Sequence, residues 1–144
     1  MAQSVLVIAD SGTGKSTSIR TLDPKETFII NIANKPLPFK GWKKNYVNIS
    51  KENPKGNMTS ASSANGIVKA KTIGKMIDNT LTLEGLFSIV LFGRVKKNED
   101  SLEYGFDTQN NGENTCKSPM GMFDDSFIPN DLQFVKDCIT TYEN

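Results

Sequence analysis

Residues 3–17 read QSVLVIADSGTGKST, and this stretch decides the expected fold. Residues 5–8 form a short apolar run, which is typical of a strand buried in a sheet. The following residues are rich in glycine, serine and threonine, and residues 16–22 (STSIRTL) read as the start of a helix. The order strand, glycine-rich loop, helix predicts a loop that holds a ligand at the end of a strand.

The loop matches the phosphate-binding pattern G-x-x-x-x-G-K-[ST], except that Ala9 replaces the first glycine. In this pattern backbone N–H groups surround a polyphosphate, a lysine reaches the β and γ phosphates and a hydroxyl ligates Mg²⁺. We therefore expect Lys15 to be the catalytic cation and Ser16 to ligate Mg²⁺. The alternative is a glycine-serine turn that matches by accident. The residues expected to bind ATP or ADP are Gly12, Thr13, Gly14, Lys15, Ser16 and Thr17.

The composition narrows the chemistry that remains. With 144 residues the chain has the size of one domain, and its two cysteines, Cys116 and Cys138, show no metal or redox spacing. Histidine is absent. This excludes Ser-His-Asp and Cys-His catalysis and histidine zinc sites. The catalytic groups that remain are carboxylates, lysines and bound Mg²⁺. These groups are suited to phosphate chemistry.

Charge is distributed unevenly along the chain. Residues 1–97 contain 15 basic and 6 acidic residues, a net charge of +9, whereas residues 98–144 contain 2 and 10, a net charge of −8. If the two segments occupy different faces, the basic face attracts nucleic acid or the acidic face of another subunit. No leader pattern or membrane-spanning run is evident, so we expect a cytoplasmic protein without a membrane partner.

Further elements follow from local patterns. Strands are expected at residues 27–32, 46–49 and 87–92, with parallel pairing of the first two strands of the chain. Residues 101–108 are expected to form an antiparallel hairpin with the strand before them. Residues 72–83 have near-helical spacing, and Asn130 is expected to cap a last helix with one apolar face. Residues 53–66 are polar and turn-rich, and they read as a flexible linker.

Cations and aromatic residues alternate in residues 39–46 (FKGWKKNY). Lysines that neutralise phosphates and rings that stack on bases are typical of surfaces for single-stranded nucleic acid. The alternative is a loop in which Trp42 packs on the core and the lysines stay in water. The nucleic-acid candidates are Lys40, Trp42, Lys43 and Lys44.

Several stretches resemble phage-encoded P-loop ATPases of the AAA or RecA-like kind, found among replication and recombination genes. They are residues 9–46, residues 69–95 (KAKTIGKMIDNTLTLEGLFSIVLFGRV), residues 107–125 (DTQNNGENTCKSPMGMFDD) and residues 126–132 (SFIPNDL). The resemblance implies a single α/β domain with a three-layer P-loop NTPase core, a mostly parallel sheet and a C-terminal antiparallel hairpin. It also implies an ATPase that assembles as an oligomer on single-stranded DNA.

The chain departs from this family between Lys55 and Val68, where members carry a Walker B strand that ends in acidic residues. The linker occupies this interval, so it reads as a deletion junction, as a site of unlisted residues or as a divergent segment. Asp10, Asp78 and Glu84 are the nearest replacement acids. Walker B carboxylates hold Mg²⁺ and orient water, and their absence predicts weak or no hydrolysis.

Three functions remain open from the sequence. The first is a Mg-ATP-binding phage protein of DNA replication or recombination. The second is a non-catalytic, nucleotide-dependent interaction module that associates with a full-length ATPase. The third is a small kinase, which is less well supported because the chain has only two arginines, Arg20 and Arg94. Arg94 reads either as a phosphate-binding finger or as a structural arginine.

Overall fold

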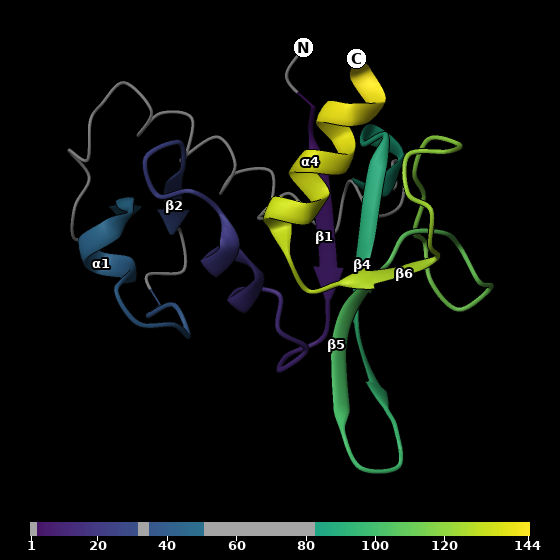
Figure 1. Ribbon diagram of the computed structural model, residues 1–144, viewed down its shortest axis with the longest axis horizontal. Coiled ribbons are helices and arrows are strands. Elements are labelled where there is room, and N and C mark those ends of the chain that lie inside the picture. The colour runs from purple at the N-terminus through teal and green to yellow at the C-terminus, as the bar shows by residue number, and fades with distance from the viewer. Residues whose placement is uncertain (1–2, 32–34, 51–82) are drawn as a thin grey trace. The chain divides into compact units, whose positions relative to one another are not determined.

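A computed structural model describes residues 3–31, 35–50 and 83–144 (Figure 1). The contacts divide the chain into two compact units, Met1–Thr21 with Leu83–Asn144, and Leu22–Thr82. The expected linker at 53–66 lies outside the described residues, as does the expected helix at 72–83 except for its last residue. The single-domain organisation therefore stays a prediction.

The first unit contains a four-stranded sheet with the order β1-β4-β5-β6. Its strands are β1 (Val5–Ala9), β4 (Ile89–Lys97), β5 (Leu102–Asp107) and β6 (Phe127–Pro129). β1 and β4 are parallel, and the other two pairs are antiparallel. The strands expected at residues 5–8 and 87–92 are thus confirmed, as is the antiparallel hairpin. In Figure 1 this hairpin extends beyond the end of β1.

Helix α4 (Leu132–Glu143) packs on one face of this sheet (Figure 1). Its N-cap is Asp131, whose side chain accepts a hydrogen bond from the Phe134 N–H, so the expected cap at Asn130 was wrong by one residue. The expected apolar face of this helix comprised Leu132, Val135, Cys138, Ile139 and Tyr142. Val135 and Ile139 are buried, Leu132 and Cys138 pack against the core, and Tyr142 is exposed. The buried core consists of Ile89, Leu91, Phe106, Met122, Phe123, Ile128, Val135 and Ile139.

The segment after the phosphate-binding pattern forms a short 3₁₀ helix, η1 (Thr17–Thr21), rather than the start of a long helix. The Ser18 hydroxyl donates to the Lys15 carbonyl at 2.6 Å, and the Thr21 hydroxyl donates to the Ser18 carbonyl at 3.0 Å. Such local bonds compete with the i to i−4 bonds of an α-helix, which explains the tighter winding. A second 3₁₀ helix, η2 (Leu83–Leu86), precedes β4.

The second unit contains two parallel strands, β2 (Phe28–Asn31) and β3 (Val47–Ser50), and the four-residue helix α1 (Trp42–Asn45). Both strands confirm the expectations for residues 27–32 and 46–49. Tyr46 is buried, donates from its hydroxyl to the Leu22 carbonyl at 2.7 Å and contacts the ring of Phe39 edge-on. Burial, with the nearby Asp23 carboxylate, raises the pKa of Tyr46.

The predicted three-layer α/β P-loop core with a mostly parallel sheet was wrong. The four-stranded sheet is mixed, with one parallel pair, and the described residues contain two α-helices, of which α4 covers one sheet face. β2 pairs with β3 in a separate sheet and not with β1 as expected. β1 instead pairs in parallel with β4 over its whole length, and η1 supplies only five helical residues between β1 and β2.

Asp131→Ala should lower the free energy of unfolding at pH 7 by about 1 kcal/mol, because it removes the N-cap of α4. Burial acts to raise the pKa of Asp131, but hydrogen bonds from the Phe134 and Gln133 N–H groups, together with Arg20, hold this pKa below its ordinary value. The contribution is therefore complete above about pH 4 and is lost as the pH falls through the lower folded-state pKa. Urea unfolding at pH 7 and pH 3 checks this, since a difference that grows on acidification would contradict it.

Candidate functional site

The loop of residues 10–16 leaves the carboxyl end of β1, where Ala9 pairs with Gly93 of β4. A Cβ atom on Gly93 would lie 2.7 Å from the Ala9 Cβ and 3.4 Å from the Thr13 hydroxyl oxygen. Only a residue without a side chain therefore allows this loop to lie against β4. Ala9 is the last residue of an extended strand, so the replacement of the first motif glycine fits the structure.

The loop curls back on itself. Gly12 and Gly14 have φ angles of 85° and 86°, which is the left-handed region that glycine adopts without strain. The Thr13 hydroxyl donates to the Asp10 carbonyl at 2.9 Å, and Lys15 Nζ donates to the Ala9 carbonyl at 3.1 Å. These two bonds close the loop at its base and place the lysine ammonium beside the loop backbone.

The loop leaves its backbone donors available. Within the part of the chain that the structure describes, the N–H groups of residues 12–16 donate to no protein acceptor. Gly12, Lys15 and Ser16 are exposed, and Thr13 and Gly14 are half-buried. Successive N–H groups without a protein acceptor, in a loop with left-handed residues, are typical of backbone segments that bind anions.

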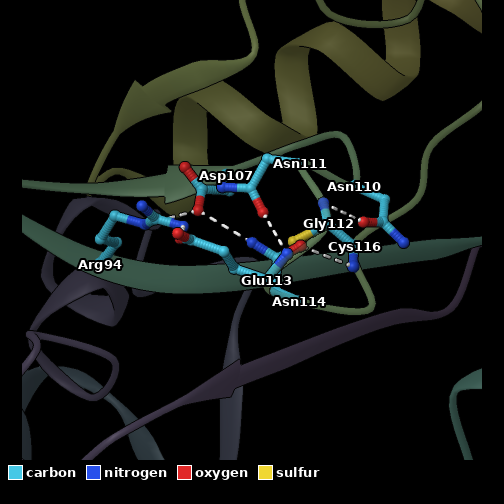
Figure 2. A network of polar contacts seen from close by, with 8 residues as sticks. All are labelled: Arg94, Asp107, Asn110, Asn111, Gly112, Glu113, Asn114 and Cys116. Carbon is cyan, nitrogen blue, oxygen red and sulfur yellow. Dashed lines mark hydrogen bonds and ion pairs between the residues drawn. The ribbon is translucent and has the colours of Figure 1, made fainter.

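A second glycine-containing loop, residues 108–116, is held in part by asparagine side chains. The side-chain oxygens of Asn110, Asn111 and Asn114 accept hydrogen bonds from the N–H groups of Gly112, Glu113 and Cys116 at 2.7, 2.9 and 3.1 Å (Figure 2). Asparagine side chains thus satisfy three N–H groups of this loop from within, as in Asx turns.

Figure 2 also shows how Arg94 is held. Its Nε lies 2.7 Å from Oδ2 of Asp107, and its NH2 lies 3.3 Å from Oε2 of Glu113. The Asn114 side-chain amide donates to the same Asp107 oxygen at 3.1 Å. Because the Asp107 side chain is nearly buried, this guanidinium compensates a charge in the interior of the unit. The geometry gives Arg94 the structural role of the two considered.

The cysteines are separate and free. Burial and the nearby Asp107 carboxylate raise the pKa of Cys116 to about 11, although Arg94 acts in the opposite direction. Burial also raises the pKa of Cys138. Since the thiolate is the reactive form, both side chains are protonated at neutral pH and neither is suited to nucleophilic chemistry.

The expected nucleotide-binding residues lie together in one loop, and Thr17 begins η1. The nucleic-acid candidates lie in the second unit. Lys40, Lys43 and Lys44 are exposed, Trp42 is half-buried, and Lys43 Nζ lies 5.5 Å from the centroid of the Trp42 ring. Phe39 and Tyr46 are the rings that anchor this segment. Whether Trp42 stacks on nucleic-acid bases or packs on the core is a question for experiment.

Ser16 fits the role of a Mg²⁺ ligand. Its side chain is exposed, and its hydroxyl makes no hydrogen bond within the described residues. The same residues contain no group of three or more histidine, cysteine, aspartate or glutamate side chains that could hold a metal ion. Mg²⁺ in such a site would take the Ser16 hydroxyl and phosphate oxygens, with water in the remaining positions.

Two residues at the site were not found from the sequence. Gly93 has a signal in the sequence, because it directly follows the apolar run of residues 87–92, and the structure pairs it with Ala9. Asn130 has none beyond its place before a helix, yet its side chain donates to the Gly14 carbonyl at 3.1 Å and accepts from Arg20 at 3.1 Å. Asn130 thus belongs to the loop's supporting structure rather than to the helix cap.

Arg94→Ala should lower the free energy of unfolding by about 2 kcal/mol, because it leaves the nearly buried Asp107 carboxylate without its cation. Glu113→Gln is the matched control. Its carboxylate is 74 % exposed, so its loss should cost less than about 0.5 kcal/mol. Urea titrations of both variants measure the difference, and equal stabilities would remove the structural role assigned to Arg94.

No helix in the described ranges has the length and apolar character needed to cross a membrane. Comparison with protein-family models, with curated proteins and with solved structures found no match to this chain. Function is therefore inferred from the geometry and chemistry of its own residues.

Proposed function

We propose that this chain binds a Mg²⁺-nucleoside triphosphate, ATP in the first instance, through the loop of residues 12–17. The observation that supports the proposal most strongly is the set of open N–H groups at residues 12–16, beside an exposed lysine ammonium and an exposed serine hydroxyl. A polyphosphate supplies acceptors for all these donors at once.

Each residue has a distinct part in this proposal. The loop N–H groups hold phosphate oxygens by charge-assisted hydrogen bonds. Lys15 exchanges its bond to the Ala9 carbonyl for the β and γ phosphates, and Ser16 ligates the metal ion. Thr13, whose hydroxyl is tied to the Asp10 carbonyl, keeps the loop curled.

Turnover is the weaker part of the proposal. Asp10 is exposed at the start of the loop. Glu84 instead lies 3.5 Å from the Thr115 hydroxyl, so Asp10 is the described candidate acid that belongs to the loop. Asp78 lies outside the described residues. We propose binding with weak or no hydrolysis, and a nucleotide-dependent interaction module is the alternative to an ATPase of DNA replication or recombination. A phage role in a bacterial cytoplasm, with oligomers or a full-length ATPase as partner, rests on the family resemblance.

Lys15→Ala should reduce the affinity for Mg-ATP about 100-fold, because it removes the only cation of the loop itself and about 3 kcal/mol of charge-assisted hydrogen bonding. Lys97→Ala, which removes an exposed lysine at the end of β4, should change the affinity less than twofold. Calorimetric titration measures the binding and any continuing heat of hydrolysis. Unchanged affinity in Lys15→Ala would refute the nucleotide-binding proposal.

Trp42→Ala tests the single-stranded DNA interaction that the family resemblance implies. If the half-buried ring stacks on a base, the substitution should weaken binding of an oligothymidylate by about 1 to 3 kcal/mol. Tyr142→Ala removes an exposed ring at the end of α4 and serves as the control. Fluorescence anisotropy gives the affinities. A loss of thermal stability without any loss of affinity would instead make Trp42 a packing residue.

A further inference from the structure

The Asn130 side chain connects the phosphate-binding loop to the junction of β6 and α4. Asn130 is 7 % exposed, and its Nδ2 donates to the Gly14 carbonyl at 3.1 Å. Its Oδ1 accepts a hydrogen bond from Arg20 at 3.1 Å, so each end of the amide has a partner of the correct kind. This pairing fixes the orientation of the amide. In a flipped side chain, Nδ2 would face the Arg20 donor and Oδ1 would face the Gly14 carbonyl oxygen.

The Gly14 carbonyl accepts a second hydrogen bond, from the Ser18 N–H at 3.1 Å. Two donors therefore hold one oxygen and fix the plane of the peptide between Gly14 and Lys15. All described peptides are trans. In a trans peptide the carbonyl and the next N–H point in opposite directions, so the Lys15 N–H points away from Asn130.

The close packing at Gly14 supports the same constraint. A Cβ atom at this position would lie 3.1 Å from Asn130 Nδ2 and 3.3 Å from Cδ1 of Tyr104. The Asn130 backbone N–H also donates to the Tyr104 carbonyl at 3.2 Å. The loop is therefore held against β5 and β6 at the residue that precedes the lysine.

We propose that Asn130 is a positioning residue that orients the Gly14–Lys15 peptide so that the Lys15 N–H faces a bound phosphate. This inference rests on the proposed nucleotide binding and adds a residue outside the loop to it. Asn130 acts through Gly14 and does not itself contact the phosphates. Its effect is expected wherever the ligand offers phosphate, with or without a base.

Asn130→Leu removes both amide partners and keeps a similar volume. It should weaken binding of Mg-ATP about tenfold in the folded protein, as expected for the loss of one well-placed N–H to phosphate bond. Binding of inorganic tripolyphosphate should weaken by the same factor. The NMR resonance of the Lys15 backbone amide should also shift in the folded, unliganded protein. A role in stability alone would not predict that shift.

Thr108→Val is the matched control. Thr108 is fully buried, its hydroxyl donates to the Asp125 carbonyl at 2.8 Å, and none of its hydrogen bonds among the described residues goes to residues 10–17. Its loss should lower stability and leave both affinities within twofold. If Asn130→Leu does not fold, Asn130→Ser replaces it, because the shorter polar side chain does not reach the Gly14 carbonyl.

The outcomes separate the two proposals. If the unaltered chain binds ATP and the Asn130 variants bind equally well, the positioning role is overturned and nucleotide binding stands. A loss for ATP without a loss for tripolyphosphate also overturns the positioning role. If the unaltered chain binds neither ligand, both proposals fail. A parallel loss for both ligands with a shifted Lys15 amide, and no loss in Thr108→Val, supports the inference.

Discussion

The close approach of β1 to β4 at Ala9 and Gly93 is the constraint on which the loop depends. With a Cβ on Gly93, the Ala9 methyl group and the Thr13 hydroxyl would both have to move, because the nearest approach would be 2.7 Å. The parallel register pairs Val5 with Ile89 and Ala9 with Gly93. It would then be disturbed at the point where the chain leaves the sheet. The loop's shape is thus set partly by a residue 84 positions away from Ala9 in the sequence.

Local patterns predicted the strands well, and they predicted one partner correctly, in the hairpin of β4 with β5, and one wrongly, for β2. The apolar residues 5–8 and 87–92 and the alternating residues 101–108 overlap β1, β4 and β5 in the structure. The choice of partner for β2 failed, because strand order alone does not say whether the connection can cross a sheet. The length of η1 depends on the Ser18 and Thr21 hydroxyl bonds, which a pattern of apolar spacing does not reveal.

The candidate loop can be located from the sequence, whereas the residue that supports it cannot. Gly12, Gly14, Lys15 and Ser16 stand in one segment with a fixed spacing, so their proximity follows from the chain itself. Asn130 is 116 residues away from Gly14, and its contact depends on the antiparallel pairing of β5 with β6. Asparagine before a helix is typical of an N-cap. The sequence pattern therefore did not indicate that the Asn130 side chain bonds to the loop.

Hydrogen bonds within and beside the loop hold part of its backbone. The bonds from Thr13, Ser18 and Asn130 hold three of its carbonyl groups, those of Asp10, Lys15 and Gly14. Fixing these peptides during folding lowers the conformational entropy that a ligand must remove on binding. Under the proposed function, a bound phosphate would also have to break the Lys15 bond to the Ala9 carbonyl. A polyphosphate would offer charge-assisted bonds to the lysine and to the loop N–H groups, whereas a neutral ligand of the same size would leave the lysine bond unchanged and gain little from the loop.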